Sequence, residues 1–214
     1  MLRRRNRLVS FYEERILPHL IDKACSATRN RKQREKIVPL AGGDILEIGF
    51  GSGLNVPYYD SGKVRKIWGL EPSAGMRRKA RPVVEGSQLD IEFIDLPGEE
   101  IPLESGSIDT VLVTYSLCTI ADTEIALAGM RRVLKPGGVL LYCEHGKAPD
   151  ESVYRWQNRL NPAWTRIAGG CNMNRDIPAL IEAGGFNIKS DERMYIPGAR
   201  VLCYNYWGAA VAAH

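Results

Sequence analysis

Short apolar runs alternate with segments of mixed polarity along most of this 214-residue chain. The first run, 45–48, is short and rich in β-forming residues, as expected for a buried parallel strand. Strands are predicted at 45–48, 66–70, 91–94, 108–114 and 138–144. Helices are expected among them at 73–80, 122–134 and 174–184, the first with Ser73 as its N-cap. Such alternation is typical of a parallel α/β sheet.

The two ends of the chain depart from this alternation. Residues 6–38 are predicted to be helical, with Pro18 interrupting them, and they precede the first strand, where a cap over a ligand would fit. Strands are expected at 186–196 and 200–211, joined as a hairpin around the turn dipeptide Pro197-Gly198. We therefore expect an N-terminal helical cap, residues 1–40, and one domain, residues 41–214, that form a single structural unit.

Composition agrees with one globular domain, because the chain is 44% hydrophobic and 25% charged and has no internal repeat. The basic start, Met1–Arg5, is not followed by an apolar signal segment. No run reaches the roughly 18 apolar residues that a membrane span needs. We expect a cytoplasmic protein without a transmembrane segment, either a monomer or a dimer.

The net charge of +4 raises the question of nucleic-acid binding. The basic residues lie in separate clusters, each expected to be a solvated helix face: Arg3–Arg7, Arg29–Lys36 and Arg77–Arg81. A nucleic-acid partner is therefore not expected, and an RNA substrate stays a minor alternative. The five cysteines are scattered without a Cys-x-x-Cys pair, so we expect neither disulfides nor a metal site.

A glycine-spaced turn follows the first predicted strand. Gly49, Gly51 and Gly53 let a ligand approach bare main chain. The dinucleotide fingerprint requires a further glycine five places after the first, where this chain has Leu54, so the match to an NAD-binding pattern is poor. The carboxylate of Glu47 would favour a cationic ligand, and S-adenosylmethionine (SAM), with its ammonium and sulfonium groups, has that charge.

An acidic residue ends the second predicted strand. Glu71 lies 22 positions beyond Gly49, close to the interval of about 20 at which a carboxylate meets the ribose hydroxyls in a Rossmann half. Two hydroxyls donating to one carboxylate form strong charge-assisted bonds. The glycine turn and this acid together indicate a nucleoside cofactor.

Five ordered motifs resemble the class I SAM-dependent methyltransferases of the type 11 kind. They are Glu47–Gly53, Gly69–Ser73, Gly98–Pro102, Ser107–Val111 and Arg132–Gly138. The resemblance covers about residues 40–145. It implies a single Rossmann-like, doubly wound sheet of seven strands in the order 3-2-1-4-5-7-6, one of them antiparallel, with helices on both faces. It also implies SAM as the cofactor and S-adenosylhomocysteine as the product.

The resemblance also implies further cofactor contacts. Gly98 and Glu99 would meet the adenine, and the main chain of Thr114 would meet the methionine moiety. Pro72, which follows Glu71 in the same motif, would also contact the cofactor. Met76 would pack against the purine, although a role in the core is equally compatible with its place on a helix.

A narrower set of motifs resembles the methyltransferase-like alkyl thiol methyltransferases of animals and bacteria. These motifs are Ser116–Ile120, Cys143–Gly146, Trp156-Gln157, Asn161–Trp164 and Gly170–Asn172. They imply a small-molecule methyl acceptor, with a thiol as the first choice and other small molecules or lipid head groups behind it. A non-catalytic SAM-binding protein and an NAD-dependent oxidoreductase are the competing classes.

Methyl transfer requires positioning more than side-chain chemistry, because the sulfonium is already activated. A general base matters only for an acceptor that arrives protonated, and His145, directly after a predicted strand, is the base candidate. A hydrogen-bonded histidine at the strand end is the equal alternative. Tyr12, Cys118, Trp156 and Trp164 are expected to line the substrate side, where both tryptophans could instead pack an insert onto the core.

Overall fold

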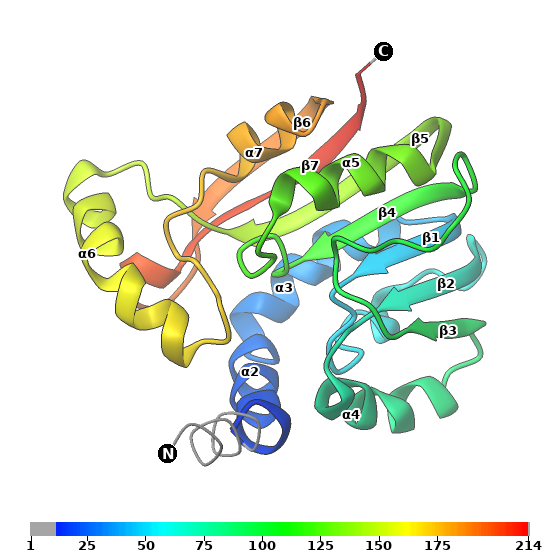
Figure 1. The fold of residues 1–214 in the computed structure, drawn as a ribbon, viewed down its shortest axis with the longest axis horizontal. Helices are drawn as coiled ribbons and strands as arrows, with labels where there is room; N and C mark the ends of the chain where they lie inside the picture. The colour runs from blue at the N-terminus through cyan, green and yellow to red at the C-terminus, as the bar shows by residue number, and fades with distance from the viewer. Residues whose placement is uncertain (1–11, 214) are drawn as a thin grey trace, which may run out of the picture.

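The structure is a computed structural model that describes residues 12–213, so residues 1–11 of the expected cap lie outside the described residues. Seven strands form one sheet in the order β3-β2-β1-β4-β5-β7-β6 (Figure 1). They are β1 Gly43–Ile48, β2 Val64–Leu70, β3 Ile91–Ile94, β4 Ile108–Thr114, β5 Leu134–His145, β6 Phe186–Tyr195 and β7 Tyr204–Ala212. All pairs are parallel except those of β7, which runs antiparallel to both neighbours. The expected fold class and strand order are confirmed.

Helices cover both faces of the sheet. They are α2 Leu17–Cys25, α3 Thr28–Ile37, α4 Ala74–Glu85, α5 Thr123–Val133, α6 Glu151–Ile167 and α7 Ile177–Ala183, after a π-helical turn at Tyr12–Ile16. Figure 1 shows α5 and α7 on the near face of the sheet and α6 beyond the end of β5. As expected, Ser73 caps α4, because its Oγ accepts from the N–H of Met76 at 3.3 Å.

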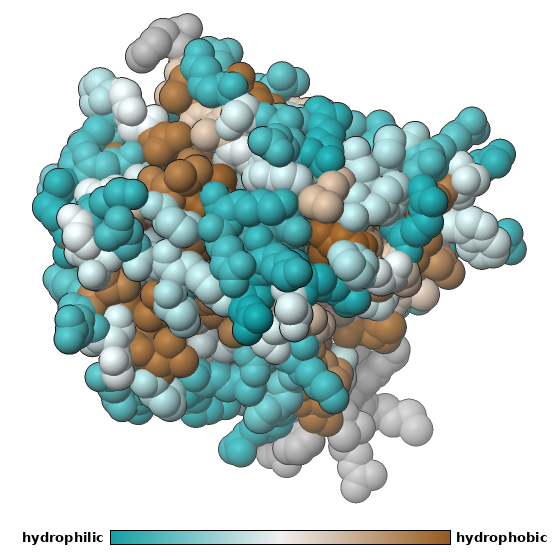
Figure 2. All heavy atoms as spheres, turned by 180° about the vertical axis from the view of Figure 1, so that it is seen from behind, coloured by the Kyte–Doolittle hydropathy of each residue, from teal (hydrophilic) through white to brown (hydrophobic). Residues whose placement is uncertain are grey.

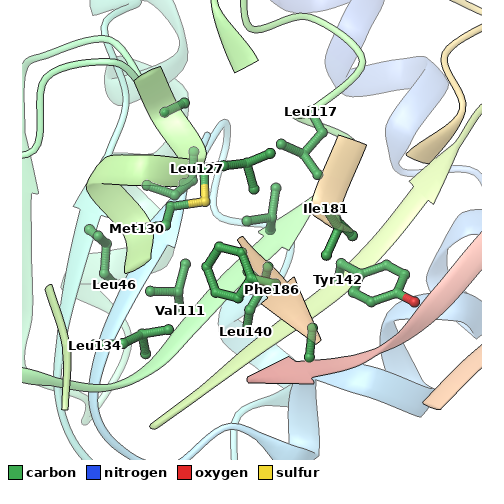
Figure 3. Packing of buried hydrophobic residues seen from close by; sticks show 14 of the residues in the cluster. Leu46, Val111, Leu117, Leu127, Met130, Leu134, Leu140, Tyr142, Ile181 and Phe186 are labelled. Carbon is green, nitrogen blue, oxygen red and sulfur yellow. The ribbon is translucent and has the colours of Figure 1, made fainter. Parts of the chain in front are cut away.

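Each face of the sheet has its own core. On one face, Met130 of α5 and Ile181 of α7 pack with Val111, Leu140 and other strand residues (Figure 3). On the other face, Ile37 of α3 and Ala80 of α4 pack against strand residues that include Ile45, Ile67 and Leu112. Because β1 and β4 are buried on both sides, the residues that follow them are held by a rigid base.

Three elements differ from the sequence prediction. The helical segment before β1 is interrupted at Ala27, which is extended (ψ 142°), whereas Pro18 is tolerated in the first turn of α2. β5 begins at Leu134 and not at 138, because Leu134 pairs with Ile108 across a register irregularity. β7 begins only at Tyr204, after a short 3₁₀ turn at Arg200–Leu202.

Hydrophilic residues cover much of the face opposite to that of Figure 1, with smaller hydrophobic patches between them (Figure 2). Over residues 12–213, no helix combines the length and the apolar character that crossing a bilayer requires. The cytoplasmic location and the division into a cap and a domain stay predictions.

Candidate functional site

A cavity of about 930 Å³ lies at the carboxyl ends of the parallel strands. Open α/β sheets bind ligands at this edge, and the volume lies near the upper end of the roughly 300–1,000 Å³ typical of small-molecule sites. The loops after β1, β2, β3 and β4 line it together with α2, α3 and the end of α6. The cavity therefore has room for a nucleoside cofactor and an additional small molecule.

The glycine turn after β1 presents main chain to this cavity. Gly49 and Gly51 line it and have φ values of 70° and 61°, in the left-handed region that favours glycine. A Cβ at Gly49 would lie 2.1 Å from the Oγ of Ser116. Close packing against the loop after β4 therefore requires glycine at this position.

Glu71 joins the glycine turn to the end of β2. Its Oε2 accepts from the N–H of Gly51 at 2.9 Å, and its Oε1 accepts from the N–H of Ser73 at 2.8 Å. Burial raises the pKa of this carboxyl, and the two backbone bonds oppose that shift. Each carboxylate oxygen can accept more than one hydrogen bond, so the group can also receive ligand hydroxyls.

Glu47 lies behind the cavity wall and does not line the cavity. The side chain is buried, and it accepts from Asn55 Nδ2 at 2.8 Å and from the Tyr59 hydroxyl at 2.5 Å. Burial raises its pKa to about 7. Asn55 does line the cavity, so the effect of Glu47 on a ligand passes through the amide that it orients.

Arg34 of α3 lies inside the site, although the sequence assigned it to a solvated helix face. It is 4% exposed and lines the cavity. Its Nε donates to Asn55 Oδ1 at 3.0 Å and its Nη1 donates to the carbonyl of Cys25 at 2.8 Å. That expectation was wrong for Arg34, because a basic stretch on a helix does not reveal which face meets the sheet.

Tyr115, the residue after β4, was also missed. It lines the cavity with φ 54°, a left-handed backbone that is costly for a residue with a Cβ and that recurs at functional sites. Its hydroxyl donates to Asn205 Oδ1 at 2.7 Å, and the Arg34 guanidinium lies 5.1 Å from its ring centre. Burial raises the pKa of this phenol well above its usual value.

A buried carboxyl group holds the turn that follows Tyr115. Glu144 Oε1 accepts from the backbone N–H of Ser116 at 2.6 Å and of Leu117 at 3.0 Å. Burial raises the pKa of Glu144 to about 7. The turn thus keeps its shape through β5, the neighbouring strand.

Most of the expected cofactor residues lie around the cavity. The lining ones are Gly49, Gly51, Glu71, Pro72, Met76, Gly98, Glu99 and Thr114. Gly53 does not line the cavity; a Cβ there would lie 3.5 Å from both Phe50 and Val83. Met76 is 8% exposed and so combines packing in the interior with contact to the cavity.

The residues expected on the substrate side are not brought together at the cavity. Trp156 is 55% exposed on α6, and Trp164 has a buried indole N–H without a partner among the described residues. The Tyr12 hydroxyl donates to the carbonyl of Ile167 at 2.7 Å. The end of α6 reaches the cavity through other residues, namely Thr165, Arg166, Gly169 and Gly170.

His145 and Cys118 lie together, next to the cavity wall but not on it. His145 Nε2 lies 3.2 Å from the Sγ of Cys171, whose Sγ is 3.8 Å from that of Cys118. Burial opposes protonation of His145, but its contact with Cys171 and the nearby Glu144 raise its pKa above the ordinary value.

Comparisons with known proteins agree with this geometry. A family model described as a methyltransferase domain matches residues 46–142. The human thiol S-methyltransferase TMT1B is 33% identical over 157 residues, which cover 72% of this chain and 64% of the relative. Human TMT1A is 31% identical over 147 residues, covering 67% and 59%. The chain thus matches less than two thirds of the length of these relatives.

A solved structure from Thermotoga maritima, described as a SAM-dependent methyltransferase and possible histamine N-methyltransferase, shares the fold with a TM-score of 0.65 and 19% identity. The match covers 94% of this chain and 98% of that one. In sequence and fold the chain resembles the class I SAM-dependent methyltransferases, which use SAM as their cofactor. Within that class it resembles the thiol S-methyltransferases.

Proposed function

We propose that this protein transfers the methyl group of SAM to a small thiol. The observation that carries the proposal is the Glu71 carboxylate, which lines the cavity beside the glycine turn with both oxygens held by backbone N–H groups. A carboxylate held in this way is preorganised to accept the two ribose hydroxyls of a nucleoside.

The charge of the cavity favours a cationic cofactor over a dinucleotide. Glu14, Glu71 and Glu99 line it, against the cations Arg34 and Arg166. Carboxylates near the ligand attract the ammonium and sulfonium of SAM and repel a pyrophosphate. Gly98 and Glu99 would contact the adenine and Thr114 the methionine moiety, with Pro72 and Met76 packing beside the nucleoside.

The remaining wall suits an apolar acceptor. Leu17 and Ile21 of α2 line the cavity, and Leu17 packs close to Gly169 at the end of α6. In the reaction, the thiolate sulfur of the acceptor attacks the methyl carbon, a new S–C bond forms, and the sulfonium C–S bond breaks to leave neutral S-adenosylhomocysteine. The cavity contributes by holding the two sulfur atoms in line with the methyl group. Such positioning can lower the activation barrier by as much as ~7–11 kcal/mol.

The acceptor needs little help to ionise. A thiol with a pKa near ~8.5 is a few per cent thiolate at pH 7, so no dedicated base is essential. A direct base must come within about 3.2 Å of the proton that it removes. His145 instead contacts Cys171 beside the cavity, so it is not placed as a direct base for an acceptor inside the cavity. We therefore assign the rate mainly to positioning.

Two measurements test the proposal. Calorimetry should give binding of SAM and S-adenosylhomocysteine with no binding of NAD, and binding of NAD alone would overturn the cofactor assignment. Release of S-adenosylhomocysteine should then appear with a panel of alkyl and aryl thiols and be weaker with the matching alcohols and amines. Tight SAM binding without release for any acceptor would instead identify a non-catalytic SAM-binding protein.

A further inference from the structure

Three potential metal ligands from distant parts of the chain meet beside the cavity. Cys118 lies in the turn after β4, His145 ends β5, and Cys171 lies between α6 and α7. Within the described part of the chain, one ligand atom from each of these three residues lies within 4.8 Å of the ligand atoms of the other two.

The separations fit a tetrahedral metal site. With Zn–S bonds of ~2.3 Å and Zn–N bonds of ~2.0–2.1 Å, two sulfur atoms lie ~3.8 Å apart and sulfur and nitrogen ~3.5 Å apart. The Sγ atoms of Cys118 and Cys171 are 3.8 Å apart, and His145 Nε2 is 3.2 Å from the Sγ of Cys171. An ion placed between them would require only small movements of these side chains.

The backbone holds the two cysteines in place without a metal. The N–H of Asn172 donates to the carbonyl of Cys118 at 2.7 Å, and its Nδ2 donates to the same oxygen at 3.1 Å. Asn161 of α6 donates through Nδ2 to Asn172 Oδ1 at 2.9 Å. Hydrogen bonds therefore fix the loop that carries Cys171 against the turn that carries Cys118, so the ligand set is preorganised.

The imidazole is available to an ion. His145 Nε2, the proposed ligand atom, already faces the Sγ of Cys171 at 3.2 Å, and the buried Nδ1 has no hydrogen-bond partner among the described residues that would hold the ring in another orientation. Cys118 is only 2% exposed, which limits competition from water at its sulfur. Sulfur and imidazole ligands select a soft or borderline ion such as Zn²⁺, whereas Mg²⁺ and Ca²⁺ prefer oxygen ligands.

We propose that Cys118, His145 and Cys171 bind one Zn²⁺ through Sγ, Nε2 and Sγ. Three protein ligands leave one position of a tetrahedral ion for a water molecule or another small ligand. Thr119 and Gly170, the sequence neighbours of the two cysteines, line the cavity. The ion would tie two parts of the cavity wall to the end of β5. This proposal does not depend on the identity of the methyl acceptor.

The test measures metal binding to the full, reduced chain. Protein purified with zinc and a phosphine reductant should contain one equivalent of zinc per chain after desalting. Titration of the zinc-free chain with Co²⁺ should give a sulfur-to-cobalt charge-transfer band that Zn²⁺ displaces. Cys118→Ser and Cys171→Ser should each lose about half of that band and bind Co²⁺ at least about tenfold more weakly.

Cys203→Ser is the matched control. Cys203 is also a buried free cysteine, but it lies in contact with the carbonyl of Pro197 and outside the cluster. Its variant should bind Co²⁺ like the original chain. If serine variants fail to fold, thermal unfolding of the original chain replaces them, and added Zn²⁺ should raise the midpoint while a chelator lowers it. A folded, reduced chain with no charge-transfer band and no zinc-dependent midpoint would overturn the proposal.

Discussion

The backbone N–H of Gly51 donates to the carboxylate of Glu71 at 2.9 Å, which joins the turn after β1 to the end of β2. Two motifs separated by 20 positions thus form one cradle, and a substitution at the acid affects both the main-chain turn and the ligand that it receives.

Glu71→Ala should raise the Kd for SAM at least about tenfold, because each charge-assisted hydrogen bond to the ribose contributes about 1.5–3 kcal/mol. Calorimetry measures the change, with chemical unfolding to separate lost affinity from lost stability. Glu92→Ala, which removes an exposed carboxylate paired with Lys66 on the neighbouring strand, is the control and should leave the Kd unchanged. An unaltered Kd in Glu71→Ala would place the ribose contact elsewhere.

Gly49→Ala should destabilise the fold by more than the conformational cost of alanine alone. Gly137 has a similar φ of 80° with nothing within 4 Å of an added Cβ, so Gly137→Ala reports that cost alone, about 1 kcal/mol. At Gly49 the new Cβ would also meet Ser116 Oγ. Urea unfolding should therefore give Gly49→Ala a clearly lower free energy of unfolding than Gly137→Ala. Equal unfolding free energies in the two variants would contradict the close contact with Ser116.

Arg34→Ala should cost about 2–4 kcal/mol of unfolding free energy, because it leaves the buried Asn55 Oδ1 and the Cys25 carbonyl without their charged donor. Arg31→Ala, on the same helix, removes an exposed pair with Glu35 and should change stability by less than about 0.5 kcal/mol. Similar losses in both variants would mean that Arg34 is not buried in solution.

Stability should fall as the pH rises from about 4.5 to about 7, through the titration of Glu47. Its pKa in the folded state is about 7, raised by burial above the usual 4.5 despite bonds from Tyr59 and Asn55. The folded chain therefore binds more protons than the unfolded chain in this window, so the unfolding free energy decreases with pH, by up to roughly 3 kcal/mol.

Glu47→Gln should reduce this pH dependence and leave the fold intact, because the amide oxygen still accepts from Asn55 or Tyr59. Denaturant unfolding at pH 5 and pH 8 gives the comparison. An identical pH slope in the variant would show that Glu47 does not titrate in this range.

The strands were predicted well from the sequence, and Glu71 lies beside the glycine turn as expected, because buried strands and glycine turns are local patterns. The contact of Glu71 with a ribose stays a prediction. The strand order came from the resemblance. α6 was not predicted as a helix, because Pro162 lies inside it. Arg34 was assigned to solvent, because a basic helical stretch does not indicate which face is covered.

The Cys118–His145–Cys171 cluster could not be predicted from spacing. Its two cysteines are 53 positions apart and the histidine belongs to a third element, so no short motif marks it. Only the sheet topology, which places the turn after β4 beside the end of β5, brings them together.

Residues of α2 and of the end of α6 line the same cavity, although 140 positions separate Cys25 from Thr165 along the chain. The compartment therefore exists only after both of these segments have docked onto the sheet. Saturation with cofactor should accordingly serve as a readout of complete tertiary assembly, and a partially folded chain should retain its strands while losing the ability to hold a nucleoside.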